Sequence, residues 1–131
     1  MSNQELINQF EAGAVREADF HHKDHVRLAF AYLQTYPVLE ALKRFSAALQ
    51  RFAASHGKPN RYHETITCAY FFLTNERLAC SGSADWEEFA TRNSDLLVWK
   101  HGILERYYED CTLNSDFARR VFVFPDKRIA Q

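Results

Sequence analysis

The sequence predicts an all-α fold, and three observations lead to that prediction. Apolar residues recur at steps of three and four over several long segments. Serine, proline and glycine stand where those segments would begin or end. The run VFVF at 121–124 is typical of a strand but has no strand partner elsewhere in the chain. We therefore expect one domain over residues 1–131, a bundle of about four long helices followed by short helices and an extended C-terminal tail.

The first two helices are predicted from their end signals. Ser2 and Glu5 have the spacing of a capping box, and Gly13 lies near the end of the first helix. The polar run FHHKD precedes a second helix that we expect over about 24–36. Pro37 ends it, because proline lacks the amide hydrogen that a helix interior needs.

The third helix has the clearest amphipathic pattern, and a fourth follows it after a short turn. The third is expected to begin after Pro37 and to end at His56-Gly57, because glycine tolerates the left-handed conformation there. For the fourth we expect Asn60 as the N-cap and an end near Cys80, before the loop at 81–83. The stripe on the third helix that should be buried consists of Leu42, Phe45, Leu49 and Phe52.

The C-terminal third is predicted to hold only short helices. Ser115 is expected to cap the last of them, and the apolar run at 121–124 should lie over the bundle as an extended tail that Pro125 ends. The predicted helical segments cover residues 84–91, 95–99, 103–110 and 115–120.

Charge and composition exclude several classes of function. A net charge of −1 gives no general attraction to nucleic acid or to an anionic membrane. The longest apolar run, at 68–73, is far shorter than the ~20 residues needed to cross a bilayer. No signal peptide is visible, and an odd number of cysteines without CxxC spacing favours reduced thiols. We therefore predict a cytoplasmic protein. The sequence does not decide whether it forms a homo-oligomer.

Two polar motifs stand at the predicted N-termini of the second and fourth helices. They read HHKDH at 21–25 and YHE at 62–64. Because one antiparallel helix separates the second from the fourth, their N-termini should lie at the same end of the bundle. Four histidines should gather there, whereas His56 and His101, at other predicted helix ends, should be solvated.

One interpretation of this cluster is a divalent-metal site. His22, His25 and His63 would supply three imidazole ligands and leave an open position, as in catalytic zinc sites. Glu64, with His63, would then be catalytic as a base or as a further ligand in metal-assisted hydrolysis or transfer. The metal would be zinc, nickel, iron or manganese. HETIT lacks the second histidine of HExxH, so the metalloprotease motif is absent.

A second interpretation is a metal-free pocket for a small anionic ligand, on a module without catalysis. Arginine binds carboxylate or phosphate through two parallel hydrogen bonds, and a helix N-terminus also attracts anions. A protein partner, or a plain capping and hydrogen-bond network, fits the same residues, so the sequence leaves open whether the protein is an enzyme. The predicted ligand-binding residues are Arg27, Arg61, Tyr62, Thr67 and Tyr70.

Three blocks of the chain resemble an uncharacterised family of small all-α bacterial proteins. The blocks are FHHKDHVRLAFAYL, YHETIT and RYY…LNSDFARRVFVFPD, and the resemblance extends over nearly the whole chain. The family patterns are similar to F-x-H-x-D-H-[LV]-R and YHE-T-[IL]-T. The resemblance supports the choice of site residues and implies no chemistry, because the family has no assigned function. The positions that match are His22, Asp24, His25 and Arg27 in the first pattern, and Tyr62, His63, Glu64, Thr65 and Thr67 in the second.

Overall fold

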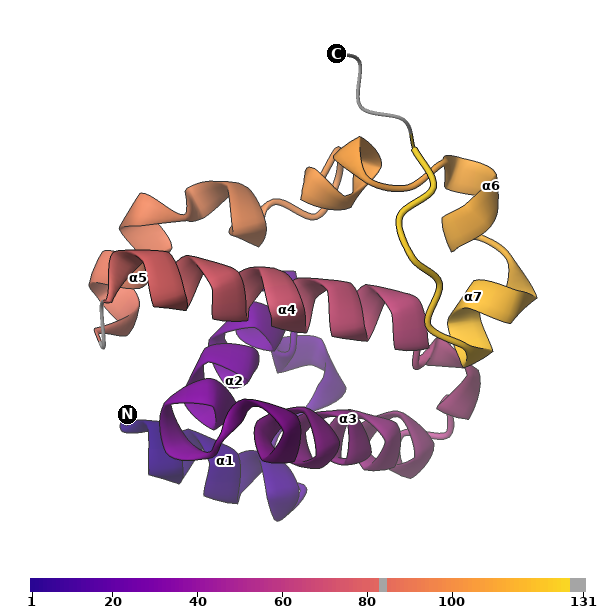
Figure 1. Cartoon of the computed structure of the whole chain (residues 1–131). Coiled ribbons are helices and arrows are strands. Elements are labelled where there is room, and N and C mark those ends of the chain that lie inside the picture. The colour runs from indigo at the N-terminus through magenta and orange to yellow at the C-terminus, as the bar shows by residue number, and fades with distance from the viewer. Residues whose placement is uncertain (83–84, 128–131) are drawn as a thin grey trace.

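The fold is all-α, as the sequence predicts. This computed structural model describes residues 1–82 and 85–127, and within them it contains helices, 3-10 turns and connecting segments but no strand. The long helices are α1 (Asn3–Glu11), α2 (His22–Thr35), α3 (Val38–Ser55) and α4 (Glu64–Ser81). Figure 1 shows α4 across the middle of the molecule, with α1, α2 and α3 on one side and the C-terminal segments on the other.

The helix α4 is buried on two sides. Phe71 belongs to a core cluster that α4 shares with α1, α2 and α3. Its neighbour Tyr70 belongs to a second cluster, with Phe89 and Leu96 of the C-terminal half. A helix that is buried on opposite sides shows no single apolar stripe. This arrangement explains why polar and apolar residues alternate along α4 without a clear period.

The predicted ends of the first three helices agree with the structure to within a few residues. The Ser2 hydroxyl accepts the Glu5 amide hydrogen at 3.1 Å and caps α1. On α3, Phe45 and Leu49 are buried, and the other two members of the predicted stripe are partly buried against the same cluster. The amphipathic pattern therefore identifies the inward face of α3 correctly.

The predicted start of α4 is wrong. Asn60 lies in a 3-10 turn, η2 (Pro59–Arg61), and the N-cap of α4 is His63. The backbone of Tyr62 is extended, so the chain leaves η2 before the helix begins. The His63 ring then accepts the amide hydrogen of Ile66 at 3.1 Å, as a polar N-cap side chain does.

The C-terminal half is made of short elements, with bounds that differ from the prediction. The segment predicted as one helix over 103–110 is a 3-10 turn followed by a separate helix, because the chain turns between Tyr107 and Glu109. Ser115 caps the last helix as predicted, through a hydrogen bond from Ala118. Ser83 and Ala84, where a loop and a helix start were predicted, lie outside the described residues. The elements are α5 (Trp86–Arg92), η3 (Ser94–Leu97), η4 (Ile103–Arg106), α6 (Asp110–Leu113) and α7 (Asp116–Arg120).

Residues 121–127 run as an irregular segment past the N-terminal end of α4 (Figure 1). The Thr65 hydroxyl accepts the Val123 amide hydrogen at 3.1 Å and lies 2.7 Å from the Ala118 carbonyl oxygen. The Tyr108 hydroxyl donates to the Val123 carbonyl oxygen over 2.6 Å. Because buried polar groups need such partners, these bonds fix the segment against α4.

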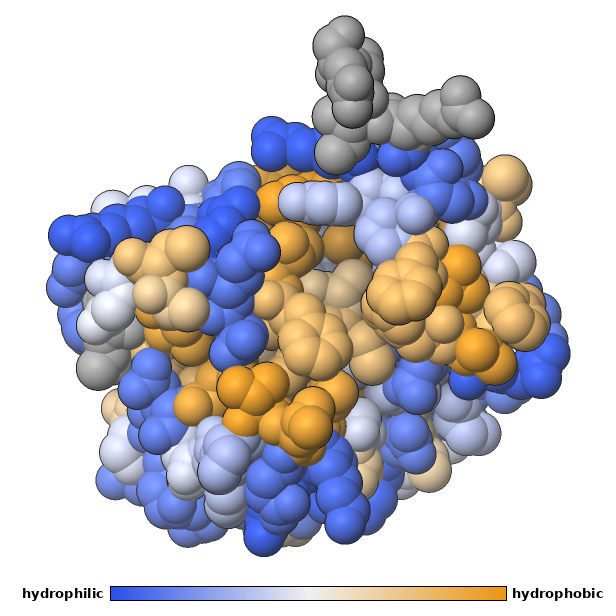
Figure 2. Space-filling view, in the orientation of Figure 1, coloured by the Kyte–Doolittle hydropathy of each residue, from blue (hydrophilic) through white to orange (hydrophobic). Residues whose placement is uncertain are grey.

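The surface carries several exposed apolar side chains. Figure 2 shows apolar residues in the middle of the face that α4 and the C-terminal segments present. Phe122 and Phe124 pack edge to face, with ring centroids 5.5 Å apart, and Phe124 stays 79% exposed. In the part of the chain that is described, no helix is both long enough and apolar enough to traverse a lipid bilayer.

Candidate functional site

The two polar motifs line one cavity. It has a volume of about 960 Å³ and lies where the N-terminal ends of α2 and α4 meet α3 and the turn η1 (Glu17–Asp19). Ligand sites commonly enclose about 300–1,000 Å³, so a small molecule fits this volume. The shared position of the two motifs agrees with the predicted topology. The histidines in its lining are His21, His22, His25, His56 and His63.

His63 is held by the protein at both ring nitrogens. Its Nδ1 accepts the Ile66 amide hydrogen at 3.1 Å, so Nε2 carries the proton and donates to the Leu113 carbonyl oxygen over 2.7 Å. Burial lowers the pKa of this imidazole, and the charge of Arg119 lowers it further. His63 is 8% exposed. It therefore acts as a helix cap that ties α4 to the segment around Leu113.

His22 keeps one ring nitrogen for the cavity. Its Nε2 donates to the Leu96 carbonyl oxygen over 2.8 Å, which leaves Nδ1 as an acceptor in the neutral form. The ring packs against Tyr70 and Trp99, with centroids 4.5 and 5.2 Å away. Burial lowers its pKa, so the neutral form is favoured.

His25 differs from both, because no hydrogen bond joins its ring to any residue that the structure describes. Its neighbours are aromatic, with the Phe20 and Phe45 centroids 5.1 and 6.1 Å away. Within the described residues no fully buried polar side-chain atom lacks a partner, so the ring nitrogens of His25 reach the open cavity. Burial lowers the pKa of His25 to about 4, and the neighbouring His22 adds to the effect. At neutral pH it offers one donor and one acceptor to a ligand.

Aromatic rings form much of the wall around these histidines. Phe20 and Phe52 are in contact, with centroids 5.0 Å apart, and both line the cavity. Trp99 lies beside His22 and is 59% exposed, so its indole stands at the cavity rim. A cavity lined by rings with a few polar groups is typical of sites for planar organic ligands.

Three cations and one carboxylate complete the lining. Lys58 Nζ and Arg61 Nη1 lie 2.5 and 3.0 Å from the same Glu17 carboxylate oxygen. Arg119 instead donates to the Asn60 carbonyl oxygen over 2.7 Å. The lining therefore has more positive than negative charge, which favours an anionic ligand.

The sequence did not single out most of these groups. Glu17, Lys58, Trp99 and Arg119 carried no motif of their own, although Arg119 lies in the block LNSDFARR that takes part in the family resemblance. His56, expected to be solvated, lines the cavity and donates through Nδ1 to the Phe52 carbonyl oxygen over 2.9 Å. His56 is half-buried, so the expectation of a solvated ring stays a prediction.

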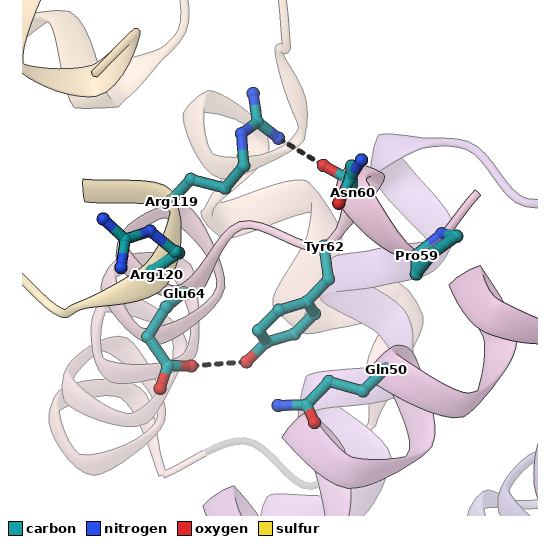
Figure 3. Close-up of a pocket in the computed structure, with 7 residues that line it drawn as sticks. All are labelled: Gln50, Pro59, Asn60, Tyr62, Glu64, Arg119 and Arg120. Carbon is teal, nitrogen blue, oxygen red and sulfur yellow. Dashed lines mark hydrogen bonds between the residues drawn. The ribbon is translucent and has the colours of Figure 1, made fainter. Parts of the chain in front are cut away.

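Glu64, predicted as the catalytic base, lies in a different pocket. This second pocket encloses about 350 Å³ (Figure 3). There the Tyr62 hydroxyl donates to a Glu64 carboxylate oxygen over 2.5 Å. Tyr62 lines both pockets, whereas Glu64 lines only the smaller of these two.

The other predicted ligand residues divide between the cavity and the core. Arg61, Tyr62 and Thr67 line the cavity. Arg27 does not, because it donates to the Asn3 side chain over 2.8 Å and packs over aromatic rings of the second core cluster. Tyr70 is 4% exposed and reaches the site through its ring contacts with His22 and Trp99.

The predicted metal ligands lie around one cavity but do not form a ligand set. Among residues 1–82 and 85–127, no three or more histidine, cysteine, aspartate or glutamate side chains are grouped so that they could hold an ion. His63 would also have to give up a capping hydrogen bond to bind metal. The divalent-metal hypothesis therefore stays a prediction without support from this geometry.

Comparisons of the chain with protein-family models, with curated proteins and with solved structures find no match. The resemblance to small bacterial proteins and the cytoplasmic location stay predictions.

Proposed function

We propose that this chain binds a small organic acid with a planar apolar body, in the cavity at one end of its helical bundle. The observation that carries the proposal is His25, a neutral imidazole without a protein hydrogen-bond partner that faces the cavity. The ring nitrogens of His25 open onto the cavity, so both the donor and the acceptor of this imidazole are accessible to a ligand that enters it.

The walls support the choice of a planar body. Phe20, Phe52 and Trp99 present ring faces and edges to the cavity. Burying a ring between such side chains contributes roughly 25 cal/mol per Å² of apolar surface removed from water. The apolar body therefore supplies most of the affinity, and the polar groups select the orientation.

The cations support the choice of an acid. Arg119 has a carbonyl oxygen as its described partner and no carboxylate, so its charge is available to a ligand. An arginine that binds a carboxylate makes a charge-assisted hydrogen bond, which is about twice as strong as a neutral one. The ligand's acid group is therefore expected on the side of the cavity that η2 and α7 form.

Calorimetric titration with a matched pair of probes tests the proposal. The probes are 2-naphthoate and its neutral amide, 2-naphthamide, which share one ring system. We expect 2-naphthoate to bind at least about tenfold more tightly, since a charge-assisted bond contributes about 1.4 kcal/mol or more. Equal affinity for the two probes, or no heat with either, would contradict the proposal.

Two arginine variants locate the acid group. Arg119→Gln should reduce the preference for the acid. Arg120→Gln is the matched control, because Arg120 is the next residue of α7 but does not line the 960 Å³ cavity and pairs with Asp116. A loss of preference in both variants alike would place the charge selectivity outside the cavity.

Metal-assisted hydrolysis or transfer at the same cavity is a separate prediction with its own test. Elemental analysis of protein purified without a histidine tag measures the metal content directly. Near-stoichiometric zinc, nickel, iron or manganese that disappears in His22→Ala would support it. If the protein contains no metal and still binds 2-naphthoate, the metal prediction fails and the anion-binding proposal stands.

A further inference from the structure

Glu17 has an unusual position among the residues that line the cavity. It is the acidic residue of the lining, and its carboxylate oxygen lies within hydrogen-bond distance of Lys58 Nζ and of Arg61 Nη1. These partners come from a different part of the chain, the turn between α3 and α4. The contact therefore connects η1 to η2 across the edge of the cavity.

Stability is a weak reason for this arrangement. Partly exposed ion pairs contribute about 0–1 kcal/mol each, because water screens them and the long side chains lose freedom. The Glu17 side chain is 32% exposed and its two partners are more so, at 47% and 69%. The three residues of η1 contain no buried side chain that would otherwise fix the turn. Glu17 thus brings a carboxylate to two cations without much gain in folding free energy.

The chemistry of the contact matches that of the proposed ligand. A carboxylate that accepts from a lysine and an arginine at 2.5 and 3.0 Å has the arrangement in which an organic acid would bind the same two side chains. The hydrogen bond from Lys58 holds the pKa of the Glu17 carboxyl below its usual range, so the group is an anion at neutral pH. An intramolecular carboxylate at this place competes with an acid in solution.

We propose that Lys58 and Arg61 form a subsite for the carboxylate of the ligand and that Glu17 is an internal competitor for that subsite. This inference rests on the proposed function, since it assigns the position and selectivity of an acid that the cavity binds. The ligand's carboxylate exchanges with that of Glu17 one for one, and the paired charges stay balanced. A neutral ligand leaves the Glu17 contact in place. Glu17 therefore determines how strongly the site prefers an acid, and Arg119 provides a third cation in the lining of the same cavity.

Titration of Glu17→Gln with 2-naphthoate and 2-naphthamide tests the inference. Glutamine keeps the shape of the side chain and removes its charge. We expect the affinity for 2-naphthoate to rise about fivefold, equivalent to ~1 kcal/mol of lost competition, and the affinity for 2-naphthamide to stay unchanged. Asp19→Asn is the control, because Asp19 lies in the same turn and pairs with Arg16 but does not line the cavity.

Three outcomes separate the inference from the proposed function. If Glu17→Gln binds 2-naphthoate more tightly than the wild type and binds 2-naphthamide equally well, the role of Glu17 and the proposed function are both supported. An affinity that is unchanged or weaker in Glu17→Gln, while the wild type binds 2-naphthoate, overturns the role of Glu17 and leaves the proposed function standing. If neither protein binds 2-naphthoate, both fail. Arg61→Gln provides a second check. It should weaken 2-naphthoate binding at least as much when it is added to Glu17→Gln as when it is made in the wild type. If Arg61→Gln leaves the affinity of the Glu17→Gln protein unchanged, the subsite is overturned.

Discussion

The N-terminal turns of α2 and α4 line the same cavity and both carry histidines, but they use them differently. At α4, His63 accepts from the Ile66 amide and donates to the Leu113 carbonyl, so both ring nitrogens are engaged within the protein. At α2, His25 has aromatic neighbours and no hydrogen-bond partner among the described residues. One histidine supports the fold, and the other is available to a ligand.

Position in the helix explains the difference. His63 is the N-cap, with an extended backbone, so its ring folds back onto an amide of the first turn. His25 is the fourth residue of α2, where its side chain is already beyond the free amides. At the start of α2 a carboxylate takes part in capping instead, since Asp24 accepts the His21 amide hydrogen at 2.9 Å. His25 takes no part in capping α2, and its ring contacts Phe20 and Phe45.

The largest expected effect is on stability at His63. His63→Ala should lower the free energy of unfolding by about 3 kcal/mol, since it removes a cap worth ~1 kcal/mol and leaves the Leu113 carbonyl without its donor. His63→Asn is the matched variant, because asparagine is a good N-cap, and it should recover about 1 kcal/mol. Urea titrations measure both. A cost below about 0.5 kcal/mol for His63→Ala, the usual range for an exposed position, would remove the distinction between the two histidines.

The next effect is a pH dependence from His25. Its pKa is about 4 in the folded protein against 6.5 when unperturbed, so the unfolded chain binds more protons between these values. The free energy of unfolding should therefore fall by about 1.5 kcal/mol as the pH drops from 6.5 to 5. Burial lowers the pKa of His22 and His63 too, so both act in the same direction.

The variant His25→Phe tests whether His25 causes this pH dependence of the free energy of unfolding. In His25→Phe the decrease between pH 6.5 and 5 should become smaller by most of this amount. Carboxylates contribute mainly below this window, because their unperturbed pKa values are 3.8 and 4.5. The same slope in wild type and variant would mean that His25 is solvated in the folded protein.

The smallest stability effect is expected for His25 at neutral pH. His25→Phe should change the free energy of unfolding by no more than about 0.5 kcal/mol at pH 7, or raise it, because functional groups are commonly kept at a cost in stability. The same variant should bind 2-naphthoate more weakly, since the hydrogen bond to the imidazole is lost. A large destabilisation without any change in binding would assign His25 to the core.

The sequence predicts the helices that form the site better than it predicts which contacts each site residue makes. Ser2, Pro37 and Ser115 mark helix ends correctly, and the stripe of α3 faces inward as expected. The meeting of the two histidine motifs follows from helix order and short connections. These features depend on local signals, or on a topology that few connections allow.

What sequence patterns miss depends on contacts between distant residues. Asn60 has the better cap propensity, but the extended backbone at Tyr62 moves the helix start to His63. The acceptor of His63 lies 50 positions further along the chain, at Leu113. Glu17 and Lys58 come together over 41 positions and have no periodic pattern. No local propensity distinguishes a histidine that has found such a partner from one that has not.

The most direct test of the account is a histidine-ring ¹H–¹⁵N NMR spectrum recorded at pH 7 before and after saturation with 2-naphthoate. It reads the tautomer and the hydrogen bonding of each imidazole separately. The account predicts that the ring nitrogens of His25 shift when the probe binds, while those of His63 keep the Nε2-protonated pattern with and without it. Shifts at His63 with His25 unchanged, or bound probe without any change at His25, would contradict it.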